Sequence, residues 1–263
     1  MNPSKIEVLK SFLDEKYYLY HQWAFIEDDP ICIPHSFTLK QDIEISGFFA
    51  AIFAWGGRKT IINKGKELMS RMDHAPYDFI LNHSNKDLVQ IVNFKHRTFN
   101  TEDLLYFVEF FHYFYHEYNS LEDAFTASIN YESKNVTQGL IEFSDLFFSL
   151  PEYPERTKKH ISSPLKNSSC KRLNMYLRWM VRKDDLGIDF GLWEKIKPAQ
   201  LLIPQDIHVG RVARKLGLLK RKQSDWEATI ELTENLKKFD PLDPVKYDFA
   251  LFGLGVVDKF ANE

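Results

Sequence analysis

Apolar side chains recur every three or four residues along most of the chain, which is the spacing of one helix face. The pattern predicts a first helix that Ser4 caps and that carries Phe12 on its apolar face. Two prolines then interrupt the pattern. A second helix is predicted from Thr38, as its cap, to the glycine pair Gly56 and Gly57. We find no run of alternating strands, no repeat and no low-complexity tract, so the predicted fold class is all-α.

The segment that follows Asn100, "TEDLLYFVEFFHYFYHEY", is the most aromatic part of the chain. Its rings at Phe107, Phe111 and Phe114 share one broad face at helical spacing. Such a face is either a platform on which nucleic-acid bases stack or one side of a core helix. We interpret it as a core helix, because large aromatic side chains contribute most when they are buried.

The clearest break in the pattern is at residues 151–170, which are rich in Pro, Ser and Lys. After the break we predict a helix from about Ser169 to Lys183, an irregular piece as far as Pro204, and three closing helices. From Arg156 to Lys183 there are nine Lys or Arg residues and no Asp or Glu. The chain as a whole has a net charge of −3, so positive charge is concentrated here.

In the predicted helix of this basic stretch, Leu177 falls on an apolar face and Lys171, Arg178 and Arg182 fall on the opposite face. Basic side chains at a helix N-terminus favour the binding of a phosphate group, because free backbone N–H groups point outward there. The alternative is a solvated surface without a ligand. Lys171 has a second potential role, since a neutral lysine amine can attack carbon and form a Schiff base.

The stretch "LLIPQDIHVGRVARKLGLLKR" sets a single acid, Asp206, before a run of basic residues. Asp206 follows Pro204, and both residues are typical of a helix start. The helix is predicted to bury Ile207 and Val212 and to end at Gly217. Asp206 is therefore either a cap alone or a cap that also stabilises a developing positive charge in an active site.

Composition narrows the class of protein. The 263 residues are 44% hydrophobic and 27% charged, as in an ordinary globular protein. Two distant cysteines, Cys32 and Cys170, exclude a four-cysteine zinc or iron–sulfur site and fit a reducing cytoplasm. The N-terminal pattern does not fit a signal peptide, and the uncharged run from Ile45 to Gly57 is too short to cross a bilayer. We expect a cytoplasmic protein without membrane, metal or cofactor.

The segment "IPQDIHVGRVARKLGL" resembles a segment of the helix-hairpin-helix DNA glycosylase superfamily, which includes endonuclease III. The aspartate of that segment is catalytic in the superfamily, which implies a catalytic role for Asp206. Upstream, "SSCKRLNMYLRWMV" resembles the segment after the superfamily's hairpin. Its lysine is the Schiff-base nucleophile of bifunctional members, which implies that role for Lys171.

The whole chain also resembles the bacterial domain-of-unknown-function 2400 family, which has no established activity. The resemblance rests on "DIEISGFFAAIFAWGGR", "SSCKRLNMYLRWMVRKDD", "GLW", "IPQDIHVGRVARKLGL" and "FDPLDPVKYDFALFGLG".

Two features depart from the glycosylase pattern. The glycine-rich hairpin that holds a DNA phosphate is absent, and "PLKNSSCKRL" takes its place. Lys171 and Asp206 are 35 residues apart, a spacing that resembles the archaeal 8-oxoguanine glycosylase branch.

The resemblance implies a helical barrel lobe over residues 36–165 and a second lobe formed by residues 1–35 and 166–263, with a cleft between them. It implies duplex DNA with a lesion as the partner and a flipped, damaged base as the target. The implied nucleic-acid contacts are Lys166, Ser168, Ser169, Arg172, Arg178, His208 and Arg211. The implied base pocket is Trp55, Arg58 and Trp179. A binding module without chemistry and a protein-binding helical scaffold remain the alternatives.

Overall fold

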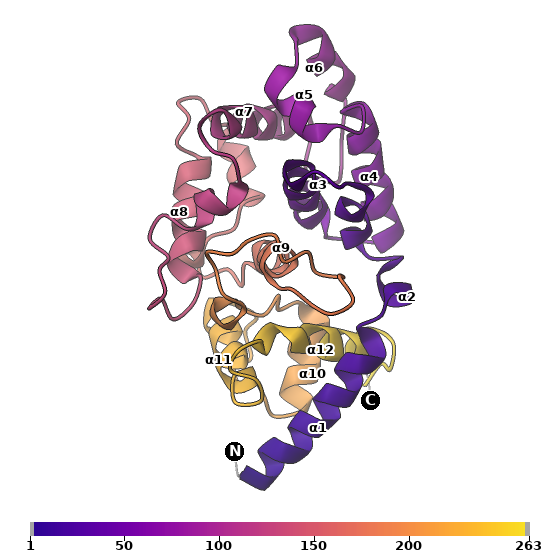
Figure 1. Ribbon diagram of the computed structural model, residues 1–263, viewed down its shortest axis with the longest axis vertical. Coiled ribbons are helices and arrows are strands. Elements are labelled where there is room, and N and C mark those ends of the chain that lie inside the picture. Colours follow the sequence, from indigo (N-terminus) through magenta and orange to yellow (C-terminus); the bar gives the residue numbers. More distant parts are fainter. Residues whose placement is uncertain (1–2, 261–263) are drawn as a thin grey trace. The chain divides into compact units, whose positions relative to one another are not determined.

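The computed structural model describes residues 3–260, and these residues form helices and no strand (Figure 1). The all-α prediction is confirmed. The α-helices are α1 (Pro3–Tyr20), α2 (Trp23–Ile26), α3 (Lys40–Phe53), α4 (Arg58–Arg71), α5 (Pro76–Asn82), α6 (Asn85–Ile91), α7 (Thr101–Glu117), α8 (Thr137–Phe147), α9 (Lys171–Val181), α10 (Ile207–Lys215), α11 (Trp226–Leu236) and α12 (Tyr247–Val256). Short 3₁₀ helices connect them: Pro30–Cys32, Pro34–Ser36, Leu121–Phe125, Glu155–Lys159, Pro164–Lys166, Pro198–Gln200 and Pro244–Lys246.

The helix predicted in the segment after Asn100 begins at Thr101. Asn100 caps α7 by accepting a hydrogen bond from the backbone N–H of Asp103. Ser4 lies inside α1, so the prediction that it caps that helix is wrong. Thr38 is also not the cap of α3, because Leu39 holds that position without a side-chain hydrogen bond.

The chain folds into two compact units. Unit 1 contains Met1–Phe25, Ile129–Gln138 and Ser163–Glu263, and unit 2 contains Ile26–Ser128 and Gly139–Ser162. Residues 129–138 lie between two segments of unit 2 in the sequence but belong to unit 1, where they are hydrogen-bonded to Gln200. Its Nε2 donates to the carbonyls of Asn130 and Ser133, each at 2.9 Å. Sequence periodicity gives no sign of this arrangement, because it depends on contacts between distant segments.

Unit 2 has an aromatic core between α3, α7 and α8. Phe48 of α3 meets Phe111 of α7 edge to face, with ring centroids 5.3 Å apart. Phe107 meets Phe147 of α8 at 4.8 Å. These rings are inaccessible to solvent, so the aromatic face after Asn100 is a core face, as we interpreted it.

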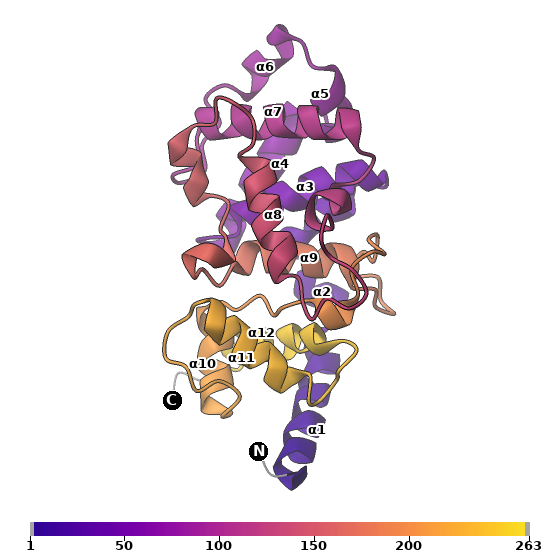
Figure 2. The same cartoon turned by 90° about the vertical axis from the view of Figure 1, so that its left-hand side faces the viewer.

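Unit 1 is built around α12, which packs on both α1 and α10 (Figure 2). Two glycines allow this close approach. A Cβ atom added to Gly253 would lie 2.2 Å from Tyr20 Cδ2 of α1, and one added to Gly255 would lie 2.9 Å from His208 Cβ of α10. The face of α12 that carries Gly255 therefore meets the first turn of α10.

Candidate functional site

The site expected from the sequence lies in unit 1, at the N-terminal ends of α9 and α10. A loop leads into α9 in place of the helical turn that was predicted from Ser169. Asn167 and Cys170 both adopt the left-handed conformation, with φ of 52° and 48°. Asparagine tolerates this conformation better than most residues. The loop is thus tightly turned without any glycine.

Polar contacts hold the loop from two sides. Asn174, inside α9, donates from Nδ2 to the carbonyl of Ser169 at 3.1 Å. The carbonyl of Asn167 accepts from the backbone N–H of Trp226 at 3.3 Å, which ties the loop to the start of α11. The loop thereby fixes the direction in which α9 begins.

Lys171 is the first residue of α9 and is half-buried. Its Nζ lies 3.3 Å from Sδ of Met175, one turn further along the helix. The side chain therefore runs along the face of α9 that also carries Arg178, because residues at i, i+4 and i+7 share one face.

Asp206 caps α10, as the sequence predicted. Its Oδ1 accepts hydrogen bonds from the backbone N–H groups of His208 at 2.8 Å and Val209 at 2.9 Å. Both bonds go to one oxygen, and Oδ2 takes no part in them. Ile207, predicted to face the core, is 57% exposed, so that expectation is wrong. Gly217 ends the helix with φ of 73°, as predicted.

A further charged residue of unit 1, Asp248 of α12, was missed by the sequence analysis. It is buried, and its Oδ2 is ion-paired with Nη1 of Arg178. Burial raises the pKa of the Asp248 carboxyl to about 6. Asp206 also raises this pKa, whereas Arg178 and Lys171 lower it. The charges of Lys171 and Asp206 thus act on one buried carboxyl.

A sequence signal for Asp248 does exist. It is the one charged residue between Tyr247 and Val256, in a helix that is otherwise apolar. A charge is seldom buried unless it is paired, so an isolated acid in such a helix indicates a partner elsewhere. The partner could not be identified from the sequence.

The basic face expected on α9 is not a surface. Every residue from Leu173 to Val181 is buried, and Arg178 is 7% exposed. Its guanidinium is paired with Asp248 and, from Nε, with Asp189 at 3.3 Å. The prediction that Arg178 faces a phosphate is therefore wrong, because its donors already serve buried carboxylates. Arg172 is half-buried, and burial lowers the pKa of its guanidinium to about 10.

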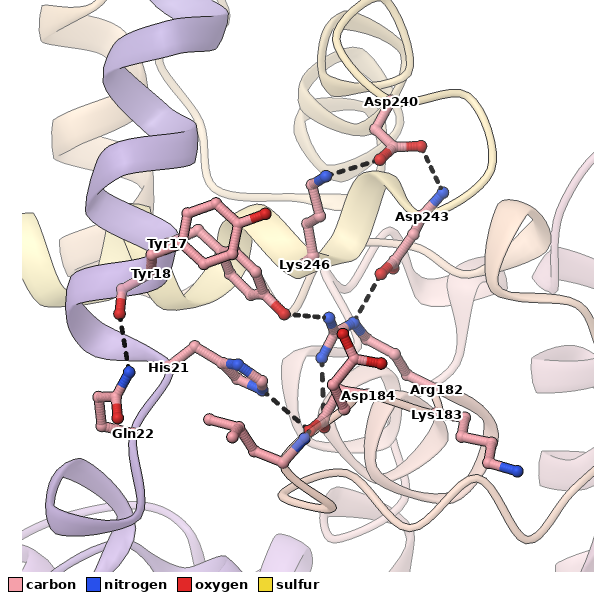
Figure 3. A pocket seen from close by; sticks show the side chains of 12 residues that line it. Tyr17, Tyr18, His21, Gln22, Arg182, Lys183, Asp184, Asp240, Asp243 and Lys246 are labelled. Carbon is pink, nitrogen blue, oxygen red and sulfur yellow. Dashed lines mark hydrogen bonds and ion pairs between the residues drawn. The ribbon is translucent and has the colours of Figure 1, made fainter.

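Arg182 was also expected on that face, and it is 3% exposed. It lines a cavity of about 420 Å³ in unit 1 (Figure 3). Its Nε donates to Asp243 at 2.8 Å, and its Nη2 donates to the hydroxyl of Tyr17 at 2.6 Å. In the wall of the same cavity, His21 Nε2 lies 3.2 Å from Oδ1 of Asp184. Charged groups in the cavity wall thus pair with one another.

The other residues predicted to contact nucleic acid differ in their exposure to solvent. Lys166 and Arg211 are exposed. Ser168 and Ser169 are half-buried in the loop, and Ser168 Oγ accepts from the backbone N–H of Cys170 at 3.2 Å. His208 is half-buried, and its ring meets the edge of Phe252 at 6.4 Å.

The three residues predicted for a base pocket are not equivalent. Trp179 is fully buried in the core of unit 1, so its predicted contact with a flipped base is wrong. Trp55 and Arg58 belong to unit 2. There, the guanidinium of Arg97 lies over the Trp55 ring, 4.5 Å from its centre.

Two kinds of structure are not found in residues 3–260. No helix in this range is long and apolar enough to cross a bilayer. Within the same range, no group of three or more His, Cys, Asp or Glu side chains is arranged to hold a metal ion.

Comparison with known proteins gives one match. The model of the family described as "Protein of unknown function (DUF2400)" matches residues 29–257, so the chain belongs to this family. The sequence resemblance to that family is thereby confirmed. No curated protein and no solved structure matches the chain.

Proposed function

We propose that this member of the DUF2400 family is a DNA glycosylase and lyase that removes a damaged base through a lysine Schiff base. The observation that carries the proposal is that the charges of Lys171 and Asp206 both act on the buried carboxyl of Asp248, which is ion-paired with Arg178. An amine at one helix N-terminus and a carboxylate at another, both of which act electrostatically on one buried acid, suit nucleophilic attack at a carbon that gains positive charge.

Each residue has a distinct role in this proposal. Lys171 attacks C1′ of the deoxyribose, and the base leaves. Asp206 stabilises the positive charge that develops on the sugar, since its Oδ2 is not used in capping α10. The C1′–O4′ bond then opens to give an imine, which permits β-elimination and a nick in the strand.

The exposed side chains near the site support DNA as the partner. Lys166 ends the short 3₁₀ helix that precedes the loop into α9, and Arg211 lies on α10, one helical turn beyond the capped end. The N-terminus of α9 adds backbone N–H groups without a side-chain cap and without an acid in its first turn. These features favour a phosphate close to Lys171.

The test is a panel of duplexes with single lesions or an abasic site, incubated with protein and borohydride. We expect a covalent adduct with the wild type, because only an amine nucleophile gives a reducible imine. Lys171→Gln should abolish the adduct and keep most of the DNA binding. Asp206→Asn should slow base release and keep the binding, because it removes a charge while preserving shape.

Lys238→Gln is the matched control. It removes one exposed lysine of unit 1, on the segment after α11, and should leave the adduct unchanged. An equal adduct with Lys171→Gln would reject Lys171 as the nucleophile. A wild type that binds DNA but gives neither an adduct nor base release would favour a binding module without chemistry.

A further inference from the structure

We infer that Asp248 accepts the proton that the Lys171 ammonium must lose before its amine can attack. The inference rests on the proposed function, and it assigns the preparation of the nucleophile to a residue of α12. The supporting evidence is the position of the Asp248 carboxylate relative to faces of α9, α12 and α10.

The first face belongs to α9. Lys171 lies on it, with Nζ 3.3 Å from Sδ of Met175, and Arg178 lies on the same face two turns beyond Lys171. Arg178 is ion-paired with Asp248, so the carboxylate of Asp248 lies against the face of α9 along which Lys171 extends. A lysine side chain has a flexible four-carbon stem, so its ammonium can move along this face towards the carboxylate.

The second face belongs to α12, and the third is the first turn of α10. Asp248, Phe252 and Gly255 are spaced at i, i+4 and i+7 and share one side of α12. Phe252 and Gly255 both contact His208, two residues after Asp206. Asp248 therefore lies on the side of α12 that faces the capped end of α10.

The two acids differ in how they are held. Asp206 Oδ1 accepts two backbone N–H groups, and a proton on that carboxyl would compete with the capping of α10. Asp248 makes its ion pair with a side chain and is buried, which raises its pKa to about 6. A carboxylate with a raised pKa is a better proton acceptor than an ordinary one. The charged groups that act on its pKa are Lys171 and Arg178 from α9, Asp189 from the segment after α9, and Asp206, the cap of α10.

The proton balance is complete without a further reactant. One N–H bond of the Lys171 ammonium breaks, and an O–H bond forms on Asp248. The neutral amine adds to the aldehyde carbon of an abasic site and gives a carbinolamine. Asp248 then returns the proton to the departing hydroxyl, which leaves as water, and a protonated imine remains.

The experiment measures the single-turnover rate of adduct formation between the full chain and an abasic duplex, with cyanoborohydride, from about pH 5 to pH 8. For the wild type we expect the rate to rise with pH through about 6 and then level off, as Asp248 becomes ionised. Asp248→Asn should lower the rate at pH 7.5 by about tenfold or more, within the range ascribed to general acid–base catalysis, and should lose the inflection near pH 6. Asp248→Glu should retain most of the rate with a shifted inflection.

Asp185→Asn is the control, because it removes an exposed acid of the same unit and should leave the profile unchanged. Circular dichroism and duplex binding establish that each variant is folded. A folded Asp248→Asn with the wild-type rate and profile overturns the inference and leaves the proposed function intact. If Asp248→Asn does not fold, a wild-type profile without an inflection near pH 6 overturns it. A wild type without any adduct overturns both proposals, and Lys171→Gln then behaves like the wild type.

Discussion

The guanidinium of Arg178 and the carboxylate of Asp248 form an ion pair inside unit 1 that joins α9 to α12. Arg178 also reaches Asp189 at 3.3 Å and lies over the ring of Phe249, 4.4 Å from its centre. The pair therefore links a residue of the basic stretch to the acid whose pKa Asp206 raises and Lys171 lowers.

Removal of one partner of the buried pair should be strongly destabilising. Arg178→Met leaves Asp248 buried without its main counter-charge, and we expect unfolding to become easier by about 3–5 kcal/mol. Urea unfolding followed by circular dichroism measures the change. The double variant Arg178→Met with Asp248→Leu should recover much of this loss, since it buries no unpaired charge. A single variant within about 0.5 kcal/mol of wild type would contradict the role of the pair.

The capping of α10 by Asp206 predicts a graded effect on stability. Asp206→Ala removes the acceptor for the N–H groups of His208 and Val209, and should cost about 1 kcal/mol. Asp206→Asn should cost much less, because asparagine caps nearly as well as aspartate. Thermal unfolding at one pH compares the two. Equal losses for both variants would show that the charge, rather than the cap, supplies the stability.

Duplex binding should depend on the exposed cations and not on the buried ones. Lys166→Ala and Arg211→Ala should each weaken binding and reduce the slope of log affinity against log salt by about one. Lys238→Ala is the matched loss of an exposed charge in the same unit and should leave the slope unchanged. Fluorescence anisotropy at several salt concentrations provides the measurement. Slopes that do not differ among these variants would count against the proposed DNA surface.

Unit 2 contains an acid whose ionisation stabilises the fold. Asp103 accepts from the hydroxyl of Thr157 at 2.8 Å and is ion-paired with Arg156. Although burial opposes the shift, hydrogen bonds from His160, Asn100 and Thr157 lower its pKa from 3.8 to about 2. Since the folded-state value lies below the unfolded one, the stabilisation is present above pH 3.8 and is lost as the pH falls towards 2.

Asp103→Asn should therefore cost about 2 kcal/mol at pH 7 and progressively less below pH 4, as measured by urea unfolding at several pH values. Glu102→Gln is the control, because that carboxylate is 55% exposed and lies 3.7 Å from Arg156 Nε. It should change stability by less than about 1 kcal/mol at any pH. A loss for Asp103→Asn that is the same at pH 3 and pH 7 would disagree with the lowered pKa.

Much of the local structure is determined by the sequence alone. The helical class follows from the spacing of apolar residues, and the caps at Asn100 and Asp206 follow from side chains that bond to N–H groups two or three residues away. The aromatic core face after Asn100 follows from its periodicity. Each of these depends on interactions within one or two helical turns, which a linear pattern records. Family membership is also carried by the sequence.

Only the tertiary structure decided which charges are buried. Periodicity placed Arg178 and Arg182 opposite an apolar face, and thus towards a phosphate or solvent, whereas both side chains are buried. Their burial is possible because Asp248, Asp189 and Asp243, from distant segments, neutralise the two guanidinium groups. Burying a charge is energetically costly unless an opposite charge lies beside it. Here the opposite charges come from distant parts of the sequence, and no local pattern records such a pairing.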